Sequence, residues 1–153
     1  MGNIDASDRK ILYLLQHDGK KTVAAIAQEL ELSSTAIYER IKKLENSGVI
    51  KKYVALLDQK KIDKNLIVFI SISLKNHGRS HLKKFESTIN GYNEITECYH
   101  IAGNFDFLLK AQLKDMEAYQ QFILTKLSVD NNIDKVQSSF VLSKNKYSTA
   151  FNV

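Results

Sequence analysis

The sequence predicts an α+β protein built in two parts, and two observations lead to this prediction. In the first part, apolar residues recur every three or four positions between capping residues, which is the spacing of amphipathic helices. In the second part, runs rich in β-branched residues alternate with helical spacing, which is typical of a sheet packed against helices. We expect the first part over residues 1–57, a polar linker over 58–65 and the second part over 66–153.

The N-terminal part opens with a helix that has a clear start signal. Asp5 and Asp8 have the spacing of a capping box, and carboxylates are favoured near the positive end of the helix dipole. Apolar residues then mark one buried face, and Asp18-Gly19 ends the helix. A second helix follows, with Thr22 as its cap.

A third helix is predicted over residues 33–47. Ser33 or Ser34 can cap its start, and Gly48 suits the left-handed conformation that follows a helix end. The link from the second helix is only a few residues long, so the two helices cross sharply, as in a helix-turn-helix. Three apolar residues share one narrow stripe of the third helix, which we expect to be buried: Ile37, Ile41 and Leu44.

The opposite face of the third helix carries hydroxyl, amide, aromatic and charged side chains. Such groups suit base edges and phosphates, and a helix is the element that fits the major groove of DNA. An ordinary solvated helix face is the alternative, so the helix has to be judged in its surroundings. The residues that we expect to contact DNA are Ser34, Thr35, Tyr38, Glu39, Arg40, Lys42, Lys43 and Asn46 on this helix, with Thr22, Lys51 and Lys52 beside it.

Residues 49–57 have an extended pattern, which predicts a wing or exit strand directly after the third helix. On such a strand, Lys51 and Lys52 lie near the phosphates that flank the groove. A solvated strand edge protected by lysines is an equal alternative for these two residues. The net charge of the whole chain is +5 and its pI is 9.2, which permits binding to a polyanion without requiring it.

The second part alternates strand and helix signals in the order β-α-β-β-α-β, the ferredoxin-like arrangement. Four antiparallel strands then form one sheet with both helices on the same face. The other face carries large apolar side chains and no cover from the chain, so we expect a partner subunit there. The strands are expected over residues 66–74, 95–101, 105–113 and 136–142, and the helices over 80–89 and 116–127.

Few residues suggest other chemistry. Cys98 is the only cysteine, and no signal peptide or membrane-length apolar run occurs, so we expect a cytoplasmic protein associated with the nucleoid. His77 and His81 are four residues apart but lack a third metal ligand. Cys98 and His100 share a strand face but lack a group that would orient them for nucleophilic catalysis. We therefore expect no catalytic residues, no metal site, no cofactor and no enzymatic activity.

Several stretches of the chain resemble the Lrp/AsnC family, the leucine-responsive and asparagine-synthetase regulators also called feast/famine regulators. They are residues 4–12, residues 32–45, Gly48-Val49-Ile50 with Tyr53, and residues 102–109. The resemblance covers nearly the whole chain. It implies a transcriptional regulator with a winged helix-turn-helix for double-stranded DNA and a C-terminal module that binds amino acids. It also implies dimers joined through their sheets, often assembled further into octamers or other assemblies of dimers.

The resemblance places an amino-acid effector in the turn before the third strand, with Gly103, Asn104 and Asp106 in the loop and Ser138 on the last strand. Glycine exposes backbone N–H groups to a carboxylate, and the Asp106 carboxylate can accept from an ammonium group. The alternative is a tight turn in which glycine supplies a positive φ and Asp106 caps the turn. The identity of the effector is not given by the sequence.

Two further expectations concern specificity and strain. An architectural protein that compacts DNA with little sequence preference is the second functional hypothesis, which a competition assay against random DNA separates from the first.

Glu31 stands at the corner of the helix-turn-helix, where glycine is usual in the family. A left-handed conformation there costs a residue with a Cβ atom about 1 kcal/mol.

Overall fold

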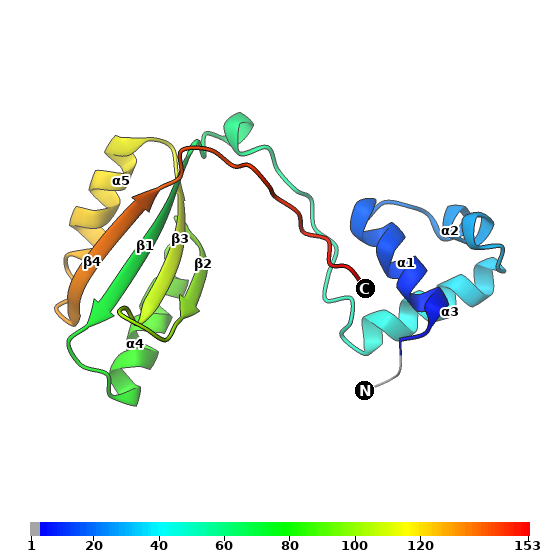
Figure 1. Cartoon of the computed structure of the whole chain (residues 1–153), viewed down its shortest axis with the longest axis horizontal. Helices are drawn as coiled ribbons and strands as arrows, with labels where there is room; N and C mark the ends of the chain where they lie inside the picture. Colours follow the sequence, from blue (N-terminus) through cyan, green and yellow to red (C-terminus); the bar gives the residue numbers. More distant parts are fainter. Residues whose placement is uncertain (1–3) are drawn as a thin grey trace. The chain divides into compact units, whose positions relative to one another are not determined.

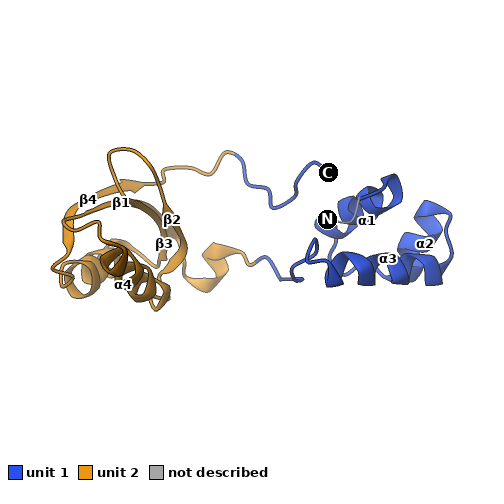
Figure 2. Cartoon of the chain, turned by 90° about the horizontal axis from the view of Figure 1, so that it is seen from below, with its two compact units in different colours: residues 1–56, 146–153 blue, residues 57–145 orange. Residues whose placement is uncertain are grey.

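A computed structural model describes residues 4–153, and the chain divides into two compact units (Figures 1 and 2). The first unit contains the residues up to Leu56 together with Lys146–Val153, and the second is Leu57–Asn145. We expected the whole chain after the linker to belong to the second part, whereas Lys146–Val153 groups with the first unit. Across residues 4–153, no helix is both long and apolar enough to cross a membrane.

The first unit is built from three helices around one apolar core. They are α1 (Ala6–His17), α2 (Val23–Leu30) and α3 (Ser34–Asn46). Asp5 caps α1 through the expected capping box with Asp8, and Thr22 caps α2 by accepting from the Ala25 N–H at 3.2 Å. The core residues are Ile11, Leu12, Ile26, Ala27, Ile37, Ile41 and Leu44.

Glu31 forms the sharp corner between α2 and α3. Its φ of 54° and ψ of 42° lie in the left-handed region, as expected for the position that glycine usually occupies. The next amide, that of Leu32, donates to the Ala27 carbonyl at 3.0 Å and closes the turn. The corner therefore keeps its geometry despite the Cβ atom of Glu31.

The prediction of a strand over residues 49–57 is wrong for the single chain that the structure describes. The Ile50 N–H donates to the Leu44 carbonyl at 3.0 Å and ends α3, but residues 51–57 belong to no helix or strand. The physical reason is that a strand needs a neighbouring strand to bond its N–H and C=O groups, and no strand among residues 4–153 pairs with this segment. We call residues 49–57 the exit segment.

The second unit is a four-stranded antiparallel sheet with helices on one face (Figure 1), which confirms the ferredoxin-like prediction. Its strands run in the order β2-β3-β1-β4. A short 3₁₀ helix, η1 (Gln59–Ile62), precedes the sheet. The elements are β1 (Leu66–Leu74), α4 (Arg79–Asn90), β2 (Ile95–His100), β3 (Phe107–Leu113), α5 (Met116–Phe122), η2 (Ile123–Leu127, a π-helical turn) and β4 (Ile133–Phe140).

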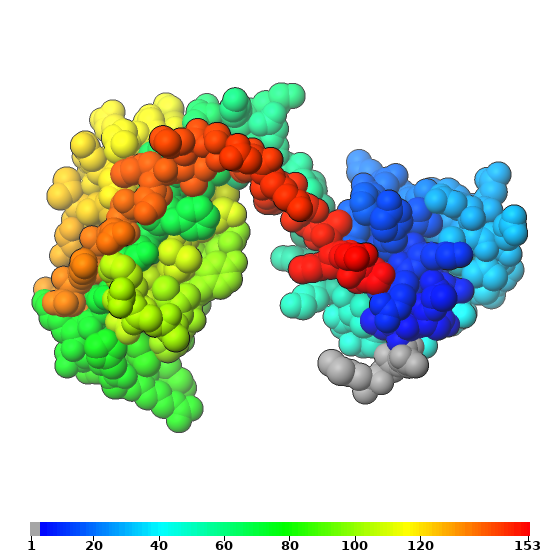
Figure 3. Space-filling view, viewed as in Figure 1, coloured from blue at the N-terminus to red at the C-terminus, as the bar shows by residue number. Residues whose placement is uncertain are grey.

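Most of these elements match their expected ranges, and β4 differs most. It was expected over residues 136–142 but begins at Ile133, because Ile133 pairs with Leu74 at the far end of β1. Leu142, expected in the strand, is 99% exposed. The pairing with β1, rather than the apolar residues of the strand itself, sets where β4 starts, and β4 lies at the surface of its unit (Figure 3).

The two faces of the sheet differ in cover. Val68, Ile70 and Ile72 of β1 point to the helix side and are fully buried, with Phe85 of α4 and Phe122 of α5 packed in the same core. The residues between them on β1 point to the other face, where Phe69 is 36% exposed. Tyr99 on β2 belongs to the same open face and is 50% exposed. No helix of the described chain covers this face within the second unit.

One side chain ties the C-terminal residues to the first unit. Gln16 of α1 donates from Nε2 to the Phe151 carbonyl at 3.2 Å and accepts from the Phe151 N–H at 2.7 Å. Phe151 and Val153 also line a hollow of about 840 Å³ together with residues of α1 and the exit segment. The sequence offered no signal for this contact, because a single glutamine pairs with backbone groups far along the chain.

Candidate DNA-binding surface and effector site

Helix α3 is fixed by its cap and by one apolar stripe. Ser33 accepts from the Ala36 N–H through Oγ at 3.1 Å, so Ser33 rather than Ser34 is the N-cap. Ile37, Ile41 and Leu44 are buried, with at most 8% exposure. Because these three residues hold one side of the helix in the core, the opposite side faces solvent.

The outer face of α3 brings together most of the residues expected to contact DNA. Tyr38 is 48% exposed even though it is aromatic. Thr22, at the start of α2, and Lys51 and Lys52, on the exit segment, are also exposed within the first unit. The exposed expected residues on α3 are Ser34, Thr35, Tyr38, Glu39, Lys42, Lys43 and Asn46.

The Lys42 ammonium contacts two neighbouring side chains on this face. Its Nζ donates to Glu45 at 3.0 Å and lies 5.8 Å from the centroid of the Tyr38 ring. The hydrogen bond to Glu45 raises the pKa of the Lys42 ammonium, and the same bond holds the pKa of the Glu45 carboxyl below its ordinary value. Glu45 accepts a second hydrogen bond from the Tyr53 hydroxyl at 3.2 Å. Burial, and then this bond, raise the pKa of Tyr53.

Arg40 makes internal ion pairs, which distinguishes it from the other expected residues. Its guanidinium donates from Nη1 to Asp5 at 2.6 Å and to Asp8 at 2.7 Å, and these bonds raise its pKa. The Asp8 N–H and then Arg40 hold the pKa of the Asp5 carboxyl below its ordinary value. Because the side chain of Asp8 is only 1% exposed, Arg40 compensates a buried charge and joins α3 to α1. Contact between Arg40 and DNA stays a prediction.

The loop expected to hold the effector is an ordered turn before β3. Gly103 has a φ of 136°, a conformation that favours glycine. The Asp106 carboxylate accepts from the Leu74 N–H at 2.7 Å and lies 3.1 Å from Nε2 of His77. The Asn104 carbonyl accepts from the Ser73 hydroxyl at 3.3 Å. The loop is therefore bonded to the end of β1, which gives Asp106 a structural role other than the turn cap of the alternative interpretation.

Ser138 lies apart from that loop. It pairs with Ile70 on β1, four positions before the Leu74 amide that bonds to Asp106. Its Oγ accepts from the Tyr119 hydroxyl at 2.8 Å. The structure thus brings Gly103, Asn104 and Asp106 into one loop and leaves Ser138 on the strand with a partner of its own.

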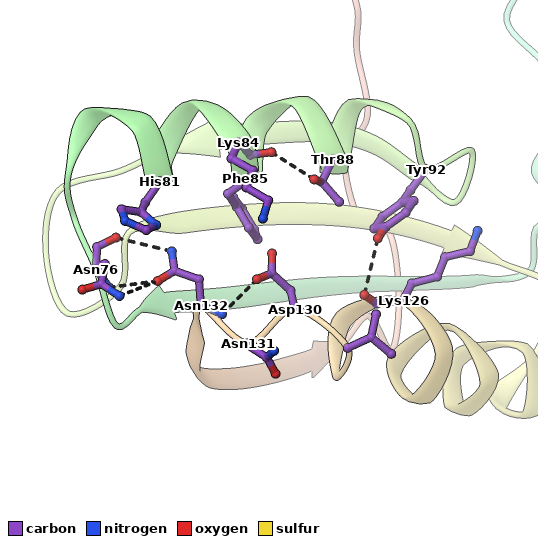
Figure 4. Close-up of a pocket in the computed structure, with 11 residues that line it drawn as sticks. Asn76, His81, Lys84, Phe85, Thr88, Tyr92, Lys126, Asp130, Asn131 and Asn132 are labelled. Carbon is purple, nitrogen blue, oxygen red and sulfur yellow. Dashed lines mark hydrogen bonds between the residues drawn. The ribbon is translucent and has the colours of Figure 1, made fainter.

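A surface hollow of about 470 Å³ lies between α4 and the segment that joins η2 to β4 (Figure 4). Its size is within the range of small-molecule sites. Asn76 and Asn132 close one end, where Oδ1 of Asn132 accepts from the Asn76 backbone N–H at 3.1 Å and side-chain amide at 3.2 Å. Sequence reasoning missed this hollow, and none of the four expected effector residues lines it. Its lining residues are Asn76, His81, Lys84, Phe85, Thr88, Tyr92, Lys126, Val129, Asp130, Asn131 and Asn132.

The residues that suggested other chemistry have ordinary surroundings. His77 bonds to Asp106, and His81 borders the hollow. Burial, and then the negative charge of Glu86, raise the pKa of the Cys98 thiol, which disfavours its nucleophilic form. No cluster of three or more histidine, cysteine or acidic side chains suited to a metal occurs within residues 4–153.

A sharp helix pair with a polar outer face, joined to a ferredoxin-like sheet unit, defines a class of DNA-binding regulators. Residues 4–51 match the model of the winged helix-turn-helix DNA-binding domain, and residues 67–151 match that of the Lrp/AsnC ligand-binding domain. The chain belongs to the Lrp/AsnC family of transcriptional regulators, as its sequence indicates. Relatives in this family are DNA-binding regulators and not enzymes.

Three similar proteins illustrate the relationship. The DNA-binding transcriptional activator DecR of Escherichia coli K12 is 32% identical over 96% of this chain and 97% of its own. The glutamate uptake regulatory protein of Zymomonas mobilis is 37% identical over 95% of this chain and 88% of its own. A transcriptional regulator of Neisseria meningitidis, solved in complex with L-Met, has a TM-score of 0.93 and 31% identity, with 97% of this chain and 96% of that chain covered.

Proposed function

We propose that α3 is the recognition helix of a sequence-specific transcriptional regulator and enters the major groove of DNA. The observation that supports this most is the outer face of α3, where polar and charged residues are exposed directly opposite the buried stripe. Thr35 and Tyr38, near the start of the helix, are placed at base edges, because the first turns of a recognition helix reach deepest into the groove. Lys42 and Lys43 are placed at phosphates.

Seven further residues complete the proposed surface. Ser34, Glu39 and Asn46 extend the outer face of α3 on either side of the base-contacting residues. Thr22 and the lysines at positions 51 and 52 flank the groove, and Arg40 reaches the backbone only if one of its ion pairs with α1 opens. Since phosphate contacts release counterions, the cations contribute affinity for all DNA, whereas the hydroxyl and aromatic groups contribute sequence preference.

The second unit is proposed to join two chains through its open sheet face. Phe69 and Tyr99 on that face are large apolar groups exposed to water, and a second copy would remove both from it. A two-fold dimer then presents two recognition helices to half-sites about one helical turn apart. In this proposal dimers assemble further into octamers or other assemblies of dimers, and the protein acts in the cytoplasm on nucleoid DNA.

An amino acid is the proposed effector, bound at the loop residues Gly103, Asn104 and Asp106, with Ser138 of β4 as a separate proposed contact. The Neisseria relative has been solved with L-Met, which supports an amino acid for this chain without fixing which one. A carboxylate offers about four acceptor positions, so Asp106 can keep its bond to the Leu74 N–H and still accept from an ammonium group. A Cβ atom at Gly103 would meet nothing within 4 Å, so a ligand can approach the backbone at this position.

DNA recognition is tested by footprinting the full-length chain on sites selected from random duplexes. We expect two protected half-sites at helical-turn spacing and a specific affinity at least about 10³-fold above that for random DNA. Uniform protection with no selected motif would instead support the architectural function.

Effector binding is tested by thermal unfolding of the full-length chain with each common amino acid at millimolar concentration. A ligand that binds only the folded state raises the midpoint by mass action, so at least one amino acid should do so. The shift should shrink in an Asn104→Ala variant. Identical midpoints with every amino acid would contradict the proposal.

A further inference from the structure

Glu45 occupies an unfavourable place in α3. It lies in the last turn of a helix that ends at Asn46, where the helix dipole presents partial negative charge and disfavours a carboxylate. Even so, its carboxylate accepts two hydrogen bonds, from Lys42 Nζ at 3.0 Å and from the Tyr53 hydroxyl at 3.2 Å. Lys42 belongs to the proposed DNA-binding face, and Tyr53 belongs to the exit segment that follows α3.

Lys42 is the partner that matters for DNA. Its side chain is 48% exposed, yet its ammonium lies 3.0 Å from the Glu45 carboxylate and 5.8 Å from the centroid of the Tyr38 ring. A phosphate that binds Lys42 has to compete with Glu45 for the same N–H donors. Once Lys42 has turned to the phosphate, the carboxylate that it leaves behind repels that phosphate.

We propose that Glu45 is a positioning residue that restrains Lys42 and thereby lowers the affinity of the recognition helix for random DNA. This inference rests on the proposed placement of Lys42 at a phosphate. Because phosphates are present in every duplex, the restraint weakens the sequence-independent part of the affinity, which is the part that random DNA offers.

Tyr53 holds the carboxylate in this position. It belongs to the exit segment, and its ring is close to Gly19 at the end of α1, where a Cβ atom on Gly19 would lie 3.9 Å from it. Its hydroxyl donates to Oε1 of Glu45, whereas Lys42 donates to Oε2. Loss of the Tyr53 hydroxyl should therefore tighten binding to random DNA, as loss of the Glu45 carboxylate does, but by a smaller factor.

The experiment measures the affinity of full-length variants for a random-sequence duplex over a series of salt concentrations. The variants are Glu45→Gln, Lys42→Gln and the double variant, with Tyr53→Phe as a second arm. Glu31→Gln is the matched control, because it removes one negative charge from the same unit and Glu31 has no ion pair within residues 4–153. Thermal unfolding by circular dichroism verifies that each variant is folded.

Glu45→Gln should tighten binding to random DNA by a factor of about two to five, the range expected for loss of one exposed ion pair. It should also steepen the dependence of log affinity on log salt by about one. In the Lys42→Gln background the same change should have little effect. Tyr53→Phe should tighten binding less than Glu45→Gln does, and Glu31→Gln should have the smallest effect.

The two ways of failing are distinguishable. If Lys42→Gln leaves the salt dependence unchanged, then Lys42 does not bind a phosphate, and its proposed placement fails together with this inference. If Lys42→Gln flattens the salt dependence but Glu45→Gln tightens binding equally with and without Lys42, the placement of Lys42 stands and the restraint is overturned. Equal effects of Glu31→Gln and Glu45→Gln would overturn the restraint as well, because charge alone would then explain it.

Discussion

The guanidinium of Arg40 on α3 lies 2.7 Å from the carboxylate of Asp8, a residue of α1 that is 1% exposed. The pair joins two helices that are distant in sequence, and it leaves no buried charge uncompensated. Asp8 also accepts from the Asp5 backbone N–H at 3.3 Å as part of the capping box. The angle at which α3 is presented therefore depends on an ion pair at its inner shoulder as well as on the apolar core.

Replacement of Arg40 by methionine should lower the free energy of unfolding by about 2 kcal/mol, because Asp8 loses its charged partner while it stays buried. Urea unfolding followed by far-UV circular dichroism measures the change. Lys43→Met on the outer face of the same helix is the control and should shift stability by less than about 0.5 kcal/mol. The role assigned to Arg40 is wrong if both variants unfold alike.

Replacement of Glu31 by glycine should raise the free energy of unfolding by about 0.5 kcal/mol. Relief of the left-handed strain contributes about 1 kcal/mol, and part of it is offset because glycine makes the unfolded chain more flexible. Glu31→Gln keeps the Cβ atom and should leave stability unchanged. A glycine variant that is less stable than the glutamine variant would show that the corner is unstrained.

Replacement of Asp106 by alanine should destabilise the second unit by about 2 kcal/mol with no effector present. The Leu74 N–H, which donates to Asp106 at 2.7 Å, loses its acceptor in a partly buried place. Asn104→Ala is the control in the same loop, because the bond from Ser73 goes to the backbone carbonyl of Asn104 and survives the change. Equal stability of the two variants would mean that Asp106 serves the effector alone.

The ion pair of Glu97 with Lys110 should make stability depend on pH. The bond from Lys110, 2.6 Å long, and then the bond from Tyr99 hold the pKa of Glu97 below its ordinary value of 4.5. A lowered pKa in the folded state means that this stabilisation is present above about pH 4.5 and is lost as the pH falls through the folded value. The free energy of unfolding should thus decline less steeply below pH 4.5 in a Glu97→Gln variant than in the native chain.

Glu86→Gln is the control for that pH dependence, because it removes a carboxyl group of the same unit for which no hydrogen bond is found within residues 4–153. The free energy of unfolding of the Glu86→Gln variant should decline on acidification about as steeply as that of the native chain. Parallel declines in the native chain and the Glu97→Gln variant would contradict the assigned role of the pair.

Local sequence signals predicted α3 well, because its cap, its apolar stripe and the residue after its end all lie within one short stretch. They failed where structure depends on distant partners. The start of β4 is set by pairing between Ile133 and Leu74, and the exit segment, which has a strand-like composition, lacks a neighbouring strand in the described chain. Composition reports what a segment prefers and does not report whether a partner is present.

The candidate sites show the same division. Exposure of Tyr38 and Lys42 followed from helical periodicity, and the structure places both on the outer face. The bonds that engage Arg40 and Asp106 could not be foreseen, because Arg40 pairs with Asp8 and Asp106 with Leu74, each 32 positions away in the sequence. Residue type identified Arg40 and Asp106 as candidates for ligand contact, but it could not show that both side chains bond to other parts of the chain.

The most direct test of the central claim is selection of preferred sites from random duplexes by the native chain and by single variants of α3. Thr35→Ala and Tyr38→Ala should change the base preference at defined positions, whereas Lys42→Ala and Lys43→Ala should keep the preference and weaken binding to all duplexes with a shallower salt dependence. One common loss of affinity in all four variants, with the selected sequence unchanged, would contradict the placement of this face of α3 in the major groove.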